Sequence, residues 1–411
     1  MKFMFFMLPT IPATLVERKE LRPIAMHQDR WDRMIEEITE LSQLAEEVGF
    51  DGICFPEHHL HSEGIEMGSL PVLTQHVIHK TKRIKVGPIG YVLPGWNPLR
   101  LALEIAWLDQ LTKGRTFVGF ARGYQTRWLN QMAQKVDVSA TLSDKSEADR
   151  VNREAFEEVF RFLKLAWGDE PFRFKGKYYE FPHPQEGTPW PAAEWTREYG
   201  FPGEVDELGR IQKINVVPKP YQKPHPELFQ AFSVSEDTIR WCARENIIPT
   251  ILLPQPEIVR KFAEAYKEES AKCGRNLKLG ERVGVVHSVL FADNKQKAYE
   301  LGAQGICGVA FNHFFRHFGF NEAFRVPEDE AKYPAGQKRL PLAEFENVRR
   351  YERSGFTYFG TPSDVQREID ALVENAHPEW FVWQSDQGFL PKDEVKRQLE
   401  IFGKEIVPRY R

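Results

Sequence analysis

Short, continuously apolar runs alternate with amphipathic stretches along most of this 411-residue chain, and this alternation constrains its fold more than any other feature. The apolar runs predict eight strands, at residues 3–8, 51–55, 84–93, 116–121, 228–232, 247–252, 282–291 and 380–384. Apolar residues at helical spacing predict helices between these strands and after the last one, at residues 30–48, 71–79, 98–111, 146–166, 235–245, 256–273 and 392–406. Continuously apolar strands are what a parallel sheet requires when helices cover both of its faces. The sequence therefore predicts an α/β fold.

The pattern favours a closed barrel over an open doubly wound sheet. A dinucleotide-binding sheet has a Gly-x-Gly-x-x-Gly turn after its first strand, and this chain has no such turn there. We therefore expect a (β/α)8 TIM barrel that spans residues 1–411 as a single domain. Such a barrel typically needs about 250 residues, so the segments at about 122–145, 167–221 and 311–359 are expected to be insertions at the barrel mouth. The second contains residues 172–179, which resemble a β-hairpin, and the third is a candidate lid.

The composition argues against several classes of function. Hydrophobic residues make up 42% of the chain and charged residues 28%, an ordinary globular balance, and the net charge is −4. The charge pattern shows no basic footprint for nucleic acid or a membrane surface, and no run reaches the roughly 18 apolar residues of a membrane span. The apolar start ends at Pro9 and predicts a buried strand rather than a signal peptide. The four cysteines lie far apart without a Cys-x-x-Cys pair, so we expect a cytoplasmic protein.

Three polar side chains, Glu57, His58 and His59, directly follow the second predicted strand. The carboxyl ends of barrel strands are where active sites lie. An imidazole exchanges a proton near neutral pH, and a neighbouring carboxylate such as Glu57 can hold its tautomer, so His58 is the candidate catalytic residue. Glu57 and His59 are expected to set its position; the alternative is a structural histidine at a strand end. We expect no metal site, because adjacent residues at a strand end point in opposite directions and cannot all converge on one ion.

A second polar group follows the fourth and fifth predicted strands. Arg122 and Gly123 end the fourth strand, and Ser233 and Ser235 end the fifth, so we expect these residues to converge at the barrel mouth. A phosphate there would receive a guanidinium fork, hydroxyl donors and the N–H groups that open the helix near Ser235. The alternative is that Ser235 only caps this helix.

Several blocks of sequence occur in an order that is typical of one family, over nearly the whole chain. They are Glu57-His58-His59-Leu60-His61-Ser62-Glu63-Gly64, Val92-Leu93-Pro94-Gly95-Trp96-Asn97-Pro98-Leu99-Arg100, residues 108–115, Gly119-Phe120-Ala121-Arg122-Gly123-Tyr124, residues 217–220 and 222–226, Ser233-Val234-Ser235 and Gly360-Thr361-Pro362. With these blocks the chain resembles the bacterial luciferase-like flavin-dependent monooxygenases.

The resemblance implies a cofactor site. The residues expected to hold the phosphate of FMN are Arg122, Gly123, Ser233 and Ser235. A non-prolyl cis peptide is implied at Ile89–Gly90 beside the flavin ring, where the alternative is a glycine-relieved bulge in a buried strand. Asn97 has two open roles, contact with the flavin edge or capping of the helix that Pro98 begins.

The resemblance also implies that His58 helps to stabilise or protonate the flavin-peroxide species. Two positions depart from the family pattern. Phe232 stands where an acid or a small residue often precedes the first serine, which puts part of the phosphate shell in question. Ala121 stands where luciferase has a reactive cysteine, which argues against light emission.

By this resemblance the protein is expected to be a two-component FMN-dependent monooxygenase. Reduced FMN from an NAD(P)H-dependent flavin reductase would react with dioxygen and oxygenate a small apolar organic substrate, and the enzyme would form a homodimer. One alternative is a deazaflavin-dependent oxidoreductase, against which the intact Glu57-His58-His59 block and Leu93-Pro94 weigh. Another is a flavin-binding barrel without catalysis, which would be expected to have lost the histidines or the phosphate serines that this chain keeps.

Overall fold

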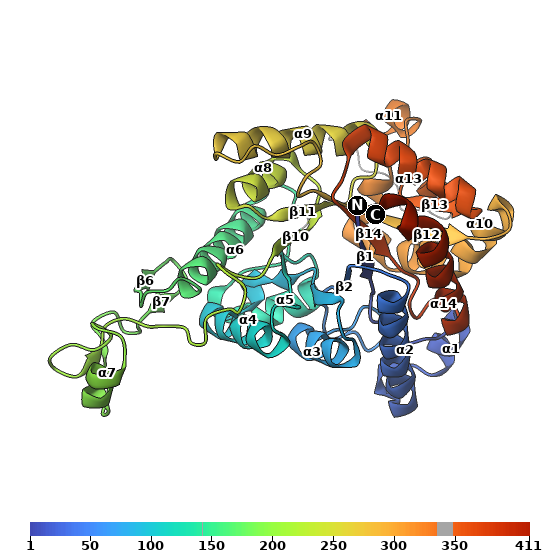
Figure 1. Ribbon diagram of the computed structural model, residues 1–411. Helices are drawn as coiled ribbons and strands as arrows, with labels where there is room; N and C mark the ends of the chain where they lie inside the picture. Colours follow the sequence, from blue (N-terminus) through green and yellow to red (C-terminus); the bar gives the residue numbers. More distant parts are fainter. Residues whose placement is uncertain (142, 335–347) are drawn as a thin grey trace. The chain divides into compact units, whose positions relative to one another are not determined.

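The chain divides into two compact units. The computed structural model describes residues 1–141, 143–334 and 348–411 (Figure 1). Unit 1 comprises Met1–Tyr91, Phe117–Ala121 and Glu227–Arg411, and unit 2 comprises Val92–Thr116 and Arg122–Pro226. The expected single domain over residues 1–411 stays a prediction.

Unit 1 contains parallel strands arranged as a nearly closed barrel. They are β1 (Lys2–Phe6), β2 (Gly52–Phe55), β3 (Lys85–Pro88), β5 (Val118–Ala121), β10 (Leu228–Ser233), β11 (Ile248–Ile251), β12 (Gly284–Phe291) and β14 (Trp380–Gln384). They lie side by side in the order β3-β2-β1-β14-β12-β11-β10-β5. At the two ends of this order β3 and β5 meet, because a Cβ atom on Gly87 would overlap the carbonyl group of Phe117. The predicted (β/α)8 barrel is confirmed, and each expected strand is present within a few residues of its expected bounds.

Two strands differ from the prediction. The expected strand at residues 84–93 is interrupted, since β3 ends at Pro88, the Ile89–Gly90 peptide bond is cis, and β4 (Tyr91–Val92) follows. The strand β13 (Thr357–Gly360) was not predicted, although it pairs in parallel with the carboxyl half of β12. Its four residues lie in and directly after the segment at 311–359 that we assigned to an insertion, and so short a run does not stand out from its flanks.

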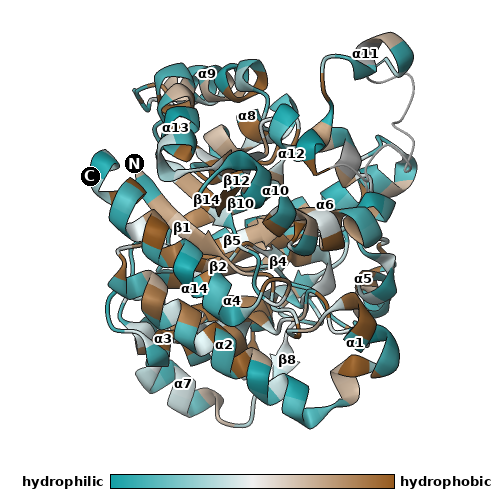
Figure 2. Ribbon diagram, turned by 90° about the vertical axis from the view of Figure 1, so that its right-hand side faces the viewer, coloured by the Kyte–Doolittle hydropathy of each residue, from teal (hydrophilic) through white to brown (hydrophobic). Residues whose placement is uncertain are grey.

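Helices cover the outside of these strands. Those of unit 1 are α1 (Leu15–Glu20), α2 (Gln28–Glu47), α3 (Leu70–Lys80), α8 (Glu236–Glu245), α9 (Pro256–Lys272), α10 (Lys295–Gln304), α11 (Asp329–Lys332), α12 (Arg349–Arg353), α13 (Pro362–Ala376) and α14 (Lys392–Ile401). Neighbouring helices contact one another, as α8 does α9, α14 does α2, and α2 does α3. Figure 2 shows hydrophobic residues concentrated on strands such as β1 and β2, and many hydrophilic residues on the helices. Within the described residues, no helix has the length and apolar character needed to cross a membrane.

Aromatic rings fill the space between β1, β14 and the end of the chain. The ring of Phe3 meets the ring of Phe402 edge-on at 5.3 Å, and Trp383 stacks on Phe402 at 4.9 Å. Phe50, just before β2, stacks against Trp383 at 5.9 Å and against Phe402 at 5.3 Å. Such ring pairs stabilise by about 0.5–1.5 kcal/mol beyond the burial of their area. A good part of the aromatic content therefore serves the core of unit 1.

Unit 2 combines helices with two small antiparallel sheets. Its elements are α4 (Pro98–Thr112), α5 (Thr126–Met132), α6 (Glu147–Ala166), β6 (Phe174–Lys175), β7 (Glu180–Phe181), β8 (Thr188–Pro189), α7 (Ala193–Tyr199) and β9 (Arg210–Ile211). β6 pairs with β7, so the predicted hairpin is present, two residues further along than expected. The carboxylate of Glu158 on α6 accepts the N–H groups of Lys177 and Tyr178 at 2.6 and 2.9 Å and so holds the hairpin turn.

Candidate active site

The loop after β2 carries His58 and is bound to the loop after β1. The N–H of Gly68 donates to the carbonyl oxygen of His58 at 3.1 Å, which closes the loop on itself. The N–H of Met67 donates to the carbonyl oxygen of Pro9 at 2.6 Å. These bonds fix the backbone on both sides of the histidine at the carboxyl ends of two adjacent barrel strands, where barrel enzymes place their chemistry.

Each of two adjacent histidines lies beside a carboxylate of its own. Nδ1 of His58 lies 3.3 Å from Oε1 of Glu66, and Nε2 of His59 lies 3.1 Å from Oε1 of Glu57. The sequence pattern pairs Glu57 with His58, whereas the structure places Glu66 beside His58 and Glu57 beside His59; a role of Glu57 at His58 stays a prediction. The reason is strand geometry: residues 57 and 59 project to the same side of an extended chain, and residue 58 projects to the other.

His58 is held in its neutral form by its surroundings. The residue is 5% exposed, and Glu66 beside it is 1% exposed. Burial lowers the pKa of His58 well below its usual value, and the nearby His61 and His59 lower it further. Burial is the largest of these causes, because a fully buried imidazolium loses its solvation. A neutral imidazole has one nitrogen that donates and one that accepts, so His58 can both take and give a proton.

His61 supports His58 from the other side. The two imidazole rings lie nearly parallel with their centres 6.2 Å apart. Nδ1 of His61 lies 2.8 Å from the carbonyl oxygen of Ile65, and because a carbonyl only accepts, this nitrogen carries the proton. The rings of His61 and Phe314 meet edge to face with their centres 5.5 Å apart. The segment around Phe314, which belongs to the candidate lid, therefore contacts the histidine loop.

A metal site was not expected at this cluster. In the part of the chain that the structure describes, His, Cys, Asp and Glu side chains form no group of three that could hold a metal ion. The absence of a metal stays a prediction.

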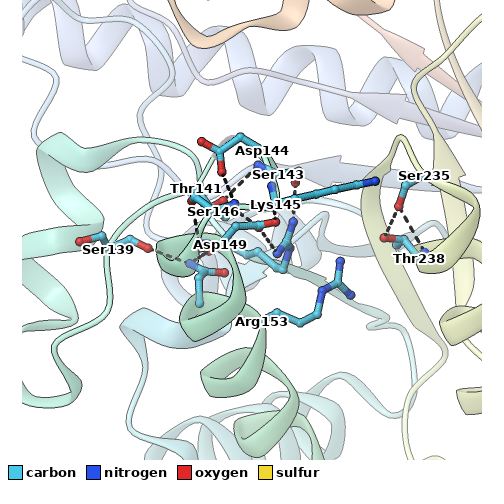
Figure 3. A network of polar contacts seen from close by, with 12 residues as sticks. Ser139, Thr141, Ser143, Asp144, Lys145, Ser146, Asp149, Arg153, Ser235 and Thr238 are labelled. Carbon is cyan, nitrogen blue, oxygen red and sulfur yellow. Dashed lines mark hydrogen bonds and ion pairs between the residues drawn. The ribbon is translucent and has the colours of Figure 1, made fainter. Parts of the chain in front are cut away.

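The serines at the end of β10 present an arrangement suited to an anion. Ser235 caps α8, and its Oγ accepts the N–H of Thr238 at 3.3 Å (Figure 3). The Oγ of Ser233 is buried and has no hydrogen-bond partner among the described residues. Glu236 opens the helix with a negative charge, but Lys261 pairs with it at 2.9 Å. A phosphate would satisfy the Ser233 hydroxyl and the first N–H groups of α8 together, so these residues fit the phosphate of FMN.

Arg122 is held within unit 2 by a network of polar contacts. Its Nη1 donates to Oδ1 of Asp149 at 2.6 Å, and its Nη2 donates to the hydroxyl of Ser143. Asp149 also accepts the hydroxyl of Thr141 at 2.8 Å (Figure 3). This carboxylate orients the guanidinium and keeps part of its donor capacity occupied. The expected convergence of Arg122 and Gly123 with the serines after β10 stays a prediction.

The structure supports a structural role at three other predicted positions. Asn97 caps α4, and its Oδ1 accepts the N–H of Arg100 at 3.1 Å; a contact with flavin stays a prediction. The Ile89–Gly90 bond is cis, as expected, and a Cβ on Gly90 would overlap the backbone of Gly119. Close approach of β5 is therefore enough to require glycine at position 90. Gly123 has a φ of +82°, in the region that glycine favours.

Two participants in these contacts escaped the sequence analysis. Glu66 lies eight residues after His58 in a loop without periodicity, and Phe314 is more than 250 residues away along the chain. Each contact depends on loop conformation, which local patterns do not encode. The only sequence signal for Glu66 is that it is an acidic residue in a histidine-rich loop, and this signal is weak.

A parallel α/β barrel that carries two histidines and a buried serine hydroxyl at the carboxyl ends of its strands has the arrangement of a barrel enzyme. The family model described as luciferase-like monooxygenase matches residues 1–377, and the chain belongs to this family. The resemblance found in the sequence is thereby confirmed, and the protein is a flavin-dependent monooxygenase.

Individual relatives are distant but cover most of the chain. The chain is 26% identical over 375 residues to 3,6-diketocamphane 1,6-monooxygenase of Pseudomonas putida, covering 89% of this chain and 90% of the relative. It is 26% identical over 385 residues to the FMNH(2)-dependent dimethylsulfone monooxygenase of Pseudomonas putida, covering 93% and 89%.

Solved structures confirm the fold. The oxygenating constituent of 3,6-diketocamphane monooxygenase of Pseudomonas putida, in complex with FMN, gives a TM-score of 0.71 at 20% identity and covers 100% of this chain and 98% of its own. An F420-dependent secondary alcohol dehydrogenase gives a TM-score of 0.62 at 13% identity, covering 100% and 99%. At these identities the likeness is one of fold, and it extends to enzymes with different cofactors.

Proposed function

We propose that this protein is a two-component monooxygenase that uses reduced FMN and dioxygen to oxygenate a small apolar organic compound. Reduced FMN would come from a separate NAD(P)H-dependent flavin reductase. The observation that carries the proposal is the buried, neutral His58 with Glu66 beside it at the carboxyl end of β2. The relatives named for oxygenation of diketocamphane and dimethylsulfone support the reaction class.

The residues at the end of β10 would bind the phosphate of FMN. Ser233 would donate its hydroxyl, and Ser235 would remain the cap of α8 while the first N–H groups of that helix face the anion. Arg122 and Gly123 are further candidates, on the strength of the sequence pattern. Ile89, Gly90 and Asn97 are candidates for contact with the ring. When bound, reduced FMN supplies the electrons that activate dioxygen, and the protein supplies orientation and exclusion of water.

The protein's own proton chemistry would centre on His58. Its neutral imidazole accepts a hydrogen bond or a proton at one nitrogen while the other faces Glu66. Glu57 and His59 would position the backbone around it through their mutual contact. A neutral group also suits a site from which water is excluded, because a permanent charge there would require solvation.

Aromatic residues of the candidate lid would keep water out and favour apolar substrates. The packed cluster consists of Phe311, Phe315, Phe324, Tyr351 and Phe356, with ring centres 4.8 to 5.4 Å apart between neighbours. Residues 335–347 of the lid segment at 311–359 lie outside the described residues. The assignment of this segment as a lid is part of the proposal, as are the cytoplasmic location and the homodimer.

The test is oxidation of chemically reduced FMN by oxygen in the presence of the protein. We expect wild-type protein to slow both the return of oxidised-FMN absorbance and the release of hydrogen peroxide, and His58→Ala to abolish this delay. Equal rates of both for the two proteins would overturn the proposal.

A second arm separates the cofactor alternatives. Reduced FMN and reduced deazaflavin are compared in the same assay, with a bicyclic ketone and dimethylsulfone as trial substrates and isotopically labelled dioxygen as the oxidant. Label in the product formed with reduced FMN supports a monooxygenase. Hydride transfer from the deazaflavin to a carbonyl, without label, would support the oxidoreductase alternative instead.

A further inference from the structure

Glu66 is fixed in an unusual backbone conformation. Its φ is +50°, in the left-handed region that residues with a side chain rarely adopt. Two bonds impose it: the N–H of Glu66 donates to the hydroxyl of Thr10 at 3.3 Å, and the N–H of Met67 donates to the carbonyl of Pro9 at 2.6 Å. Thr10 is itself held, since its N–H donates to Oε1 of Gln387 at 2.9 Å. Three loops, after β1, β2 and β14, therefore meet at this residue.

The conformation directs a carboxylate to His58 in the interior of unit 1. Glu66 is 1% exposed, and its Oε1 lies 3.3 Å from Nδ1 of His58. A buried carboxylate is costly unless it is paired, and a strained backbone that delivers one calls for a reason. The adjacent pair of Glu57 and His59 is less enclosed, since the side chain of His59 is 20% exposed. Of the two carboxylates, Glu66 is the one that faces the deeper histidine.

We propose that Glu66 is the positioning residue of His58: its buried carboxylate accepts a hydrogen bond from the Nδ1–H of His58 and so assigns proton exchange to Nε2. The inference rests on the catalytic role given to His58 under the proposed function. The distance of 3.3 Å is longer than the roughly 2.7–2.9 Å of a charge-assisted hydrogen bond. The contact therefore has room to shorten when His58 takes up a proton, which is common for catalytic pairs in the absence of substrate.

The ring of His61 also restricts the ring of His58. His61 lies parallel to it at 6.2 Å and is fixed through Nδ1 to the carbonyl of Ile65, the residue before Glu66. The loop after β2 thus supplies both the carboxylate of Glu66, which lies beside Nδ1 of His58, and the ring of His61, which stacks on the ring of His58. Loss of the Glu66 charge is expected to alter the tautomer of His58 while the ring stays in place.

The first experiment requires no flavin. Full-length protein with ¹⁵N-labelled histidine is examined by NMR over a pH series, with His58 and His59 assigned through His58→Gln and His59→Gln. In Glu66→Gln we expect the nitrogen shifts of His58 to move and those of His59 to stay. Glu57→Gln is the matched control, because it neutralises the other buried carboxylate, and it is expected to move His59 instead. Wild-type shifts for His58 in Glu66→Gln would overturn the proposal.

The second experiment measures coupling of reduced FMN oxidation to product formation. Glu66→Gln is expected to lower the product yield about tenfold at unchanged KM and to release the balance as hydrogen peroxide, and Glu66→Asp to restore part of the yield. Glu40→Gln on α2, where Glu40 pairs with Lys392 at 3.0 Å away from the histidine loop, is the control and is expected to stay within about twofold of wild type. If His58→Ala lowers the yield and Glu66→Gln does not, the proposal for Glu66 fails. If neither variant affects oxidation, the proposed function fails, and the NMR result still decides the role of Glu66.

Discussion

Replacement of Glu37 by glutamine is expected to stabilise the protein above neutral pH and to change little at about pH 5. Glu37 lies on α2, is 3% exposed, and its Oε1 accepts the N–H of Gly388 at 3.2 Å and an N–H of Gln387 at 3.4 Å. Burial raises its pKa to about 7, against the partial opposition of these two hydrogen bonds. Glutamine keeps the accepting oxygen and removes the ionisation.

The size of the effect follows from proton linkage. The ordinary pKa is 4.5, so between about pH 4.5 and 7 the native state holds a proton that the unfolded state has lost. The free energy of unfolding therefore falls as the pH rises through this window. At about 1.4 kcal/mol per pH unit, the difference between 4.5 and about 7 amounts to about 3 kcal/mol. Relaxation of the surrounding loop reduces this, so we expect a gain of roughly 1–3 kcal/mol for Glu37→Gln at about pH 8.

Urea unfolding at several pH values between about 5 and 8 measures this directly. The matched control is Glu40→Gln on the same helix, because Glu40 pairs with Lys392 at 3.0 Å and Lys396 at 3.4 Å, and these contacts lower its pKa. The control is expected to keep the wild-type pH slope in this window. If Glu37→Gln also keeps the wild-type slope, Glu37 is ionised in the folded protein at neutral pH and the reasoning is wrong.

Three further substitutions probe other parts of the molecule. Gly90→Ala places a Cβ against the backbone of Gly119, so we expect little folded protein by circular dichroism and size-exclusion chromatography. Ser233→Ala removes a buried hydroxyl without a hydrogen-bond partner among the described residues, so thermal stability should hold while affinity for reduced FMN, titrated without oxygen, falls about tenfold. Glu158→Ala leaves the N–H groups at the hairpin turn unpaired and should cost roughly 1–3 kcal/mol in urea unfolding; unchanged hydrogen exchange at Tyr178 would contradict this.

The barrel could be predicted because each of its eight strands is an apolar run with a helical stretch beside it. β13 (Thr357–Gly360) could not be predicted in the same way. It pairs only with the carboxyl half of β12, at Ser288 to Phe291, and it follows a segment without a clear period. A strand of four residues is specified by its partner strand more than by its own sequence pattern, so local periodicity does not identify it.

The candidate site also contains residues that could be predicted from the sequence and one that could not. His58 stands next to a strand end, where the fold itself predicts function, and the serines after β10 stand in the same position on another strand. Glu66 reaches His58 only because its backbone adopts a positive φ, which a glutamate gives no reason to expect. The sequence assigned the nearer carboxylate, Glu57, to His58. Neighbours along an extended strand face opposite ways, and this rule accounts for the contact of Glu57 with His59.

The two hydrogen bonds of Glu37 also connect α2 to the histidine loop. Gln387, which donates to Glu37, donates in addition to the carbonyl of Thr10 at 3.0 Å, and the hydroxyl of Thr10 accepts the N–H of Glu66. Glu37→Gln preserves an acceptor for Gln387, whereas Glu37→Ala removes it and leaves buried donors unpaired. We therefore expect only the alanine variant to raise the share of reduced FMN that ends as hydrogen peroxide when a substrate is present, although both variants remove the ionisable group. Similar peroxide yields in the two variants would show that Thr10 and Glu66 are held without the help of α2.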